Sequence, residues 1–107
     1  MTFYIKRNDT SPSMLATLQD ANAADIDLTS ASVRFHMWPI STQTVTVDEA
    51  ATVVTALEGL VRYDWQAADT ATIGSYQAEF EVTYADGSIE TFPNDGYVRV
   101  EIIKDIA

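Results

Sequence analysis

The sequence predicts an all-β fold in which seven to nine short strands form an antiparallel sandwich, and three observations lead to it. Apolar and polar residues alternate over many short stretches, which is the pattern of a strand with one buried face. Turn signals separate these stretches at intervals of roughly 8–12 residues. The Asp86-Gly87 dipeptide lies between two such stretches, and this pair closes tight hairpins because it accepts positive φ.

The first half of the chain contains four segments with a strand pattern. They predict strands at residues 2–6, 13–20, 32–38 and 42–47. Pro39 ends the third segment, and the fourth is rich in β-branched residues. The segment between residues 21 and 31 has no such pattern, so we predict a loop that Ile26 and Leu28 anchor to the core.

Residues 48–56 are ambiguous. Asp48 has the side chain of a helix N-cap, whereas Thr52-Val53-Val54-Thr55 favours a strand. We predict a strand with a bend near Asp48.

Four further strands are predicted at residues 60–66, 74–85, 88–92 and 96–103. Their alternation directs the aromatic side chains of residues 63–84 inward, where such side chains dominate the energetics of a core. The predicted core residues are Val33, Phe35, Tyr63, Trp65, Tyr76, Phe80 and Val82. No linker or internal repeat divides the chain, so we predict one domain over residues 1–107.

Tyr76 lies near the start of the longest predicted strand, shortly after Asp69 and Ala71. Immunoglobulin-type sandwiches place a tyrosine at this point, and its hydroxyl bonds back to the backbone a few residues upstream. We therefore predict that the Tyr76 hydroxyl bonds the backbone near residues 69–71. The predicted fold class is an immunoglobulin-like antiparallel β-sandwich of seven to nine strands.

Eight short motifs, in their order and spacing, resemble one known family. They are Asp9, Pro12, residues 15–20, Ile26-Asp27-Leu28-Thr29-Ser30-Ala31, Val33-Arg34-Phe35-His36-Met37, Gly59-Leu60-Val61-Arg62-Tyr63, Gly74-Ser75-Tyr76-Gln77-Ala78-Glu79-Phe80 and Asp86-Gly87. Together they resemble the N-terminal domain of phage baseplate upper proteins, an immunoglobulin-like module of tail and fibre proteins.

The resemblance implies a virion structural protein of a tail, baseplate, neck or fibre adaptor, assembled in the host cytoplasm. Its expected partners are other virion subunits, in many copies and in a symmetric assembly. The edges at residues 3–5 and 98–103 are candidates for strand addition by a neighbour. Two alternatives stay open: a head decoration protein, and a carbohydrate-binding module that recognises host surface glycans.

The composition favours protein partners over nucleic acid or membranes. Six lysine and arginine residues against sixteen aspartate and glutamate residues give a net charge of −10, which repels phosphate. The chain contains no cysteine, so neither a disulfide nor a thiolate metal site is possible. The sequence has no apolar run of the kind that crosses a membrane. We expect no cofactor.

The candidate partner-contact residues are Tyr4, Arg34, His36, Trp38 and Tyr97. In the strand alternation Arg34, His36 and Trp38 share the face opposite Phe35, where they would form an aromatic and cationic patch of the kind found at protein–protein contacts. The ordinary alternative is a solvated sheet face. Tyr4, Trp38, Phe92 and Tyr97 are the aromatic residues left for a glycan surface.

No catalytic or metal motif is evident, so we predict a protein that is not an enzyme. His36 is the only histidine, and no nucleophile elbow or phosphate-binding loop accompanies it. Aspartates recur in predicted loops, but none forms a calcium-binding loop motif. Asp27 and Asp86 are instead expected to stabilise turns.

Overall fold

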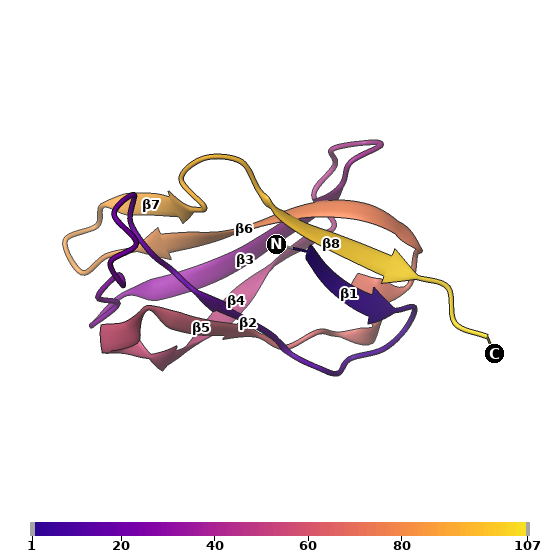
Figure 1. Cartoon of the computed structure of the whole chain (residues 1–107), viewed down its shortest axis with the longest axis horizontal. Coiled ribbons are helices and arrows are strands. Elements are labelled where there is room, and N and C mark those ends of the chain that lie inside the picture. Colours follow the sequence, from indigo (N-terminus) through magenta and orange to yellow (C-terminus); the bar gives the residue numbers. More distant parts are fainter. Residues whose placement is uncertain (1, 107) are drawn as a thin grey trace.

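The computed structural model describes residues 2–106 and is all-β, with eight strands and two short 3₁₀ turns (Figure 1). The strands are β1 (Thr2–Lys6), β2 (Met14–Thr17), β3 (Ser32–Pro39), β4 (Val47–Thr55), β5 (Leu60–Tyr63), β6 (Gly74–Thr83), β7 (Ile89–Phe92) and β8 (Val98–Ile103). The turns are η1 (Ala56–Glu58) and η2 (Ala67–Thr70). The predicted strand number is therefore confirmed. Among residues 2–106, no helix is long and apolar enough to cross a membrane.

The strands form one sheet in the order β1-β8-β6-β3-β4-β5-β2, and β7 pairs with β6 beyond the end of β8. β1 runs parallel to β8, and the other pairs are antiparallel. The long strand β4 changes partner along its length: residues 47–51 pair with β3, and residues 52–55 pair with β5. The sheet therefore folds over, and β2 and β5 lie opposite β6 and β8 in a nearly closed barrel (Figure 1).

The core lies between these two halves of the sheet. All seven predicted core residues are buried, and Phe35 lies at the centre with its ring stacked on Tyr63 at a centroid distance of 4.2 Å and tilted against Phe80 at 5.2 Å. Leu28 is also buried and Ile26 packs against the core, as predicted for the loop. The alternation of apolar and polar residues along the strands predicted these inward positions, because successive side chains of a strand point to opposite faces of the sheet.

Residues 42–47 do not form a separate strand, which corrects one prediction. Residues 40–46 turn back immediately after β3: Gln43 adopts a positive φ of 53°, and its amide donates to the Pro39 carbonyl. Thr46 donates its amide to Met37, and β4 then begins at Val47. The strand predicted for residues 48–56 is confirmed as β4, but the bend predicted near Asp48 is wrong: pairing with β3 is regular over residues 47–51, and the irregularity lies between Val53 and Thr55.

Two predictions about exposure at the C-terminal end are wrong. Phe92 is buried, because β7 pairs with β6 in a register that sets Phe92 opposite the core residue Phe80. β8 is not an edge strand, because it pairs with β1 along one side and with β6 along the other. Free sheet edges remain at β1 and β2, and at the side of β7 away from β6.

The polar turn residues act largely as predicted. The Asp86 carboxylate accepts hydrogen bonds from the Ser88 amide and hydroxyl in the hairpin, and Asp27 does the same for Thr29. The Tyr76 hydroxyl donates to an upstream backbone carbonyl at 2.6 Å, but that carbonyl belongs to Thr72.

The Asp69 side chain makes a separate set of contacts. It accepts hydrogen bonds from the Tyr63 hydroxyl and from the Gln66 amide, and so closes η2. Burial and the Asp69 carboxylate raise the pKa of Tyr63, so this phenol remains a donor.

Candidate functional site

One outward-facing surface of the sheet gathers aromatic, cationic and carboxylate side chains from β3, β4 and β6 and from Tyr97, the residue just before β8. Because side chains alternate, the residues between the core positions of these strands point away from the core. The registers set Trp38 beside Gln77, and His36 between Glu79 and Asp48. We call this surface the outer face, and its residues are Arg34, His36, Trp38, Asp48, Gln77, Glu79 and Tyr97.

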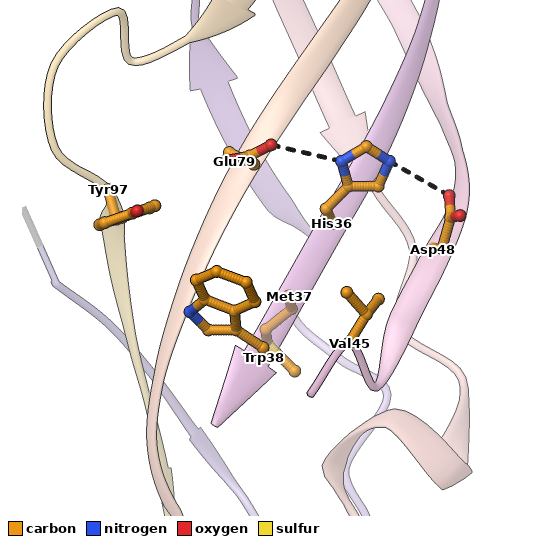
Figure 2. Close-up of a pocket in the computed structure, with 7 residues that line it drawn as sticks. All are labelled: His36, Met37, Trp38, Val45, Asp48, Glu79 and Tyr97. Carbon is orange, nitrogen blue, oxygen red and sulfur yellow. Dashed lines mark hydrogen bonds and ion pairs between the residues drawn. The ribbon is translucent and has the colours of Figure 1, made fainter. Parts of the chain in front are cut away.

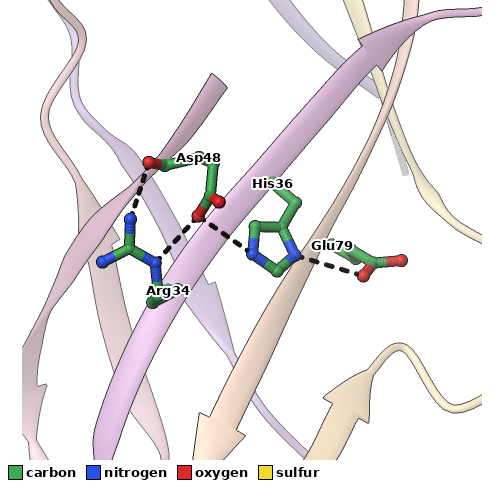
Figure 3. A network of polar contacts seen from close by, with 4 residues as sticks. All are labelled: Arg34, His36, Asp48 and Glu79. Carbon is green, nitrogen blue, oxygen red and sulfur yellow. Dashed lines mark hydrogen bonds and ion pairs between the residues drawn. The ribbon is translucent and has the colours of Figure 1, made fainter. Parts of the chain in front are cut away.

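Four of these residues form a line of polar contacts across three strands (Figure 3). Arg34 donates from Nε to Asp48 Oδ1 at 2.8 Å and from Nη2 to the Asp48 carbonyl at 2.7 Å. His36 Nε2 lies 3.2 Å from the same Asp48 Oδ1, and His36 Nδ1 lies 3.4 Å from Glu79 Oε2. The line therefore joins β4, β3 and β6 and fixes the orientation of the imidazole.

The charges in this line stabilise one another. The hydrogen bond from Arg34 lowers the pKa of the Asp48 carboxyl, and the Asp48 carboxylate raises the pKa of Arg34. Both side chains are about half exposed, so solvent and salt screen this pair, and its contribution to stability is small.

Next to this line lies a hollow of about 290 Å³ (Figure 2). Its lining residues are His36, Met37, Trp38, Val45, Asp48, Glu79 and Tyr97. The Trp38 indole donates from Nε1 to Gln77 Oε1 at 2.9 Å, and this bond fixes the ring. The Tyr97 ring lies 6.2 Å from the Trp38 ring, centre to centre, with a tilt of 49° between their planes.

The structure brings four of the five predicted contact residues together. Arg34, His36, Trp38 and Tyr97 share the outer face, although Trp38 is half-buried while half of Tyr97 is exposed. Tyr4 is 62% exposed but lies on β1, opposite Glu101 of β8, and does not line the hollow.

Val45, Asp48, Gln77 and Glu79 also belong to this site, although they were not among the residues predicted from the sequence. The alternation of β6 does predict that Gln77 and Glu79 point outward. No sequence signal shows that β6 pairs with β3, or that the hairpin after β3 returns Val45 and Asp48 to the same surface. The site depends on these long-range pairings.

Within residues 2–106, no group of three or more histidine, aspartate or glutamate side chains is arranged to hold a metal ion. The arrangement offers aromatic rings and carboxylates, which are suited to binding.

Comparison with solved structures supports the fold. The chain is similar to CopC from Methylosinus trichosporium OB3b, with a TM-score of 0.52, 16% sequence identity, and coverage of 99% of this chain and 87% of that one. At this identity the similarity describes the fold alone. No curated protein matches the sequence.

A family model matches most of the chain. The model describes the BppU N-terminal domain, the N-terminal domain of the phage baseplate upper protein, and it aligns with residues 3–93. The match includes β1 to β7, with Arg34, His36, Trp38, Asp48 and Glu79 of the outer face, whereas Tyr97 and β8 follow it. The chain belongs to the BppU N-terminal domain family.

Proposed function

We propose that this domain is a non-enzymatic structural component of a phage virion and that it docks onto other virion subunits through its outer face. The family suggests a structural role in the baseplate, which favours virion subunits as partners and a role other than catalysis. The single observation that carries the proposal is the grouping of His36, Trp38 and Tyr97 around one hollow of the outer face, with Arg34 bound to Asp48 at its border.

The grouping has the chemistry of a protein–protein contact. Aromatic and arginine side chains dominate binding energy at such contacts, because they bury large areas and combine apolar surface with hydrogen-bonding groups. The core provides a rigid support for them: Phe35 and Met37 of β3, and Ala78 and Phe80 of β6, are buried directly beneath the outer face. A partner would therefore meet a surface that needs little reorganisation.

The strand pairing also supports the immunoglobulin-like arrangement within this role. In that fold, the second and fifth strands pair in one sheet, and the third, sixth and seventh pair in the other. Here β2 pairs with β5, β3 pairs with β6, and β6 pairs with β8. The bond from Tyr76 to Thr72 lies at the start of β6, where such domains carry their corner tyrosine.

A carbohydrate-binding role is the second candidate, and one observation favours it. Trp38 and Tyr97 are adjacent, and the Gln77 amide and Glu79 carboxylate border them. Their planes are tilted by 49°, however, so one face of a sugar ring cannot lie flat against both aromatic rings. The large aromatic residues Tyr63, Trp65, Tyr76, Phe80 and Phe92 are buried and unavailable to a glycan.

Co-purification with phage particle components tests the proposal. The tagged protein should retain baseplate or tail subunits in the presence of a chelator and at moderate salt, and Trp38→Ala should weaken that association. Leu57→Ala is the matched control, because Leu57 is a 72% exposed apolar residue in η1, outside the outer face. Binding to a glycan array without any particle association would contradict the proposal and favour the second candidate.

A further inference from the structure

We propose that the hollow of the outer face takes the guanidinium group of an arginine side chain from a partner subunit. This inference rests on the proposed docking function and adds the chemistry of the partner. The hollow of about 290 Å³ lies at the lower end of the range for ligand sites, about 300–1,000 Å³, and has room for one side chain.

The carboxylates of the hollow differ in how far they are neutralised. Asp48 receives Arg34 at 2.8 Å and His36 at 3.2 Å on one oxygen, so its charge is already paired. Glu79 has only the 3.4 Å contact between its Oε2 and His36 Nδ1, and within residues 2–106 no lysine or arginine forms an ion pair with it. About a third of the Glu79 side chain is exposed. Glu79 is therefore the acceptor that an incoming cation would meet.

The aromatic rings complete a cation site. A cation over an indole or phenol face is attracted by the ring quadrupole, and tryptophan gives the strongest attraction. Trp38 is fixed by its bond to Gln77, and Tyr97 lies across from it at 6.2 Å (Figure 2). A guanidinium is planar, stacks on aromatic rings and donates in pairs to a carboxylate, so it matches this combination better than an ammonium does.

Arg34 and Arg99, two cationic residues of this sheet surface, are already paired with other carboxylates and do not line the hollow. The Arg34 guanidinium is bound to Asp48, and the Arg99 guanidinium is bound to Glu101 at 2.8 Å. The net charge of −10 also attracts a basic partner surface and raises its rate of encounter.

Titration of the whole protein with acetyl-arginine-amide, followed by NMR, tests the inference. The expected result is a saturable shift of the Trp38 indole N–H signal together with the backbone signals of Glu79 and Tyr97. Acetyl-citrulline-amide is the matched ligand control, because it has nearly the same shape without the charge, and it should give no saturable shift. Glu79→Gln should weaken arginine binding about fivefold or more.

Glu81→Gln is the matched protein control, because it removes the next outward carboxylate of β6, which does not line the hollow. It should leave arginine binding unchanged. Equal binding of the citrulline ligand, or unchanged binding by Glu79→Gln, would overturn the inference. If particle association still depends on Trp38 in that case, the docking function stands and only the guanidinium assignment fails.

Discussion

The inner and outer faces of β3 are built from alternate residues of the same eight-residue strand, yet they are determined in different ways. Val33, Phe35 and Met37 point inward and are almost completely buried. Arg34, His36 and Trp38 point outward and contact side chains of β4 and β6. The inner residues stabilise the fold by burial, whereas the outer residues form a surface whose chemistry depends on the neighbouring strands.

Because of this difference, we expect substitutions on the inner face to change the stability of the fold and substitutions on the outer face to change binding. Changes to the inner face should lower the free energy of unfolding, because buried apolar area and packing are lost. Changes to the outer face should leave that free energy nearly unchanged and alter binding instead. The predictions that follow test this separation, in order of decreasing effect.

The largest effect is expected for Phe80→Ala on the inner face of β6. Phe80 is 1% exposed and packs against Phe35, so its truncation removes buried area and leaves a cavity. The free energy of unfolding should fall by about 3–5 kcal/mol in denaturant titration. That is a large share of a total stability of about 5–15 kcal/mol.

Glu81→Ala is the control for that measurement, because Glu81 is the next residue of the same strand and points outward. It should change the free energy of unfolding by no more than about 0.5 kcal/mol. Similar losses in both variants would contradict the assignment of the two faces.

Trp38→Ala should have the next largest effect, and on binding instead of folding. Loss of an aromatic contact residue is expected to weaken assembly with virion subunits by more than about 1 kcal/mol. Binding can be measured by titration with the purified partner, and circular dichroism should show an unchanged fold. A variant that binds as well as the parent would remove Trp38 from the contact.

Tyr76→Phe should cost about 1 kcal/mol of stability, the net value of one hydrogen bond. The hydroxyl donates to the Thr72 carbonyl at 2.6 Å, and the ring itself stays buried in the core. Denaturant titration of Tyr76→Phe beside the parent measures this loss. If Tyr76→Phe has the same free energy of unfolding as the parent, this hydrogen bond makes no net contribution to stability.

The smallest effect is expected for Asp48→Asn, and it should depend on pH. Because contact with Arg34 lowers the folded-state pKa of Asp48 below its ordinary value of 3.8, the carboxylate adds stability above that value. This contribution is lost as the pH falls through the lowered pKa. The melting temperatures of parent and variant should therefore differ slightly at neutral pH and converge in acid, and a constant difference down to strongly acidic pH would contradict this origin.

The inner face could be predicted from the sequence, because burial depends on local alternation. Every predicted core position, from Val33 to Val82, is buried for this reason. The hairpin at Asp86-Gly87 was equally predictable, since its turn chemistry lies within two residues.

The outer face could be predicted only in part. Alternation identified Arg34, His36 and Trp38 as neighbours on one face, but not Asp48 and Glu79, which reach His36 through pairings between distant strands. The turn after β3 was missed because the β-branched residues 42–47 have a strand-like composition while the Gln43 backbone adopts a positive φ. Phe92 was misplaced because its direction depends on the register between β7 and β6.

A cryo-electron map of the phage particle that carries this protein tests the central claim most directly. The account predicts that Trp38 and Tyr97 are covered by a neighbouring virion subunit, with a basic side chain of that subunit against Glu79. A map in which the domain contacts its neighbours through other surfaces, while Trp38 and Tyr97 face solvent, would contradict it.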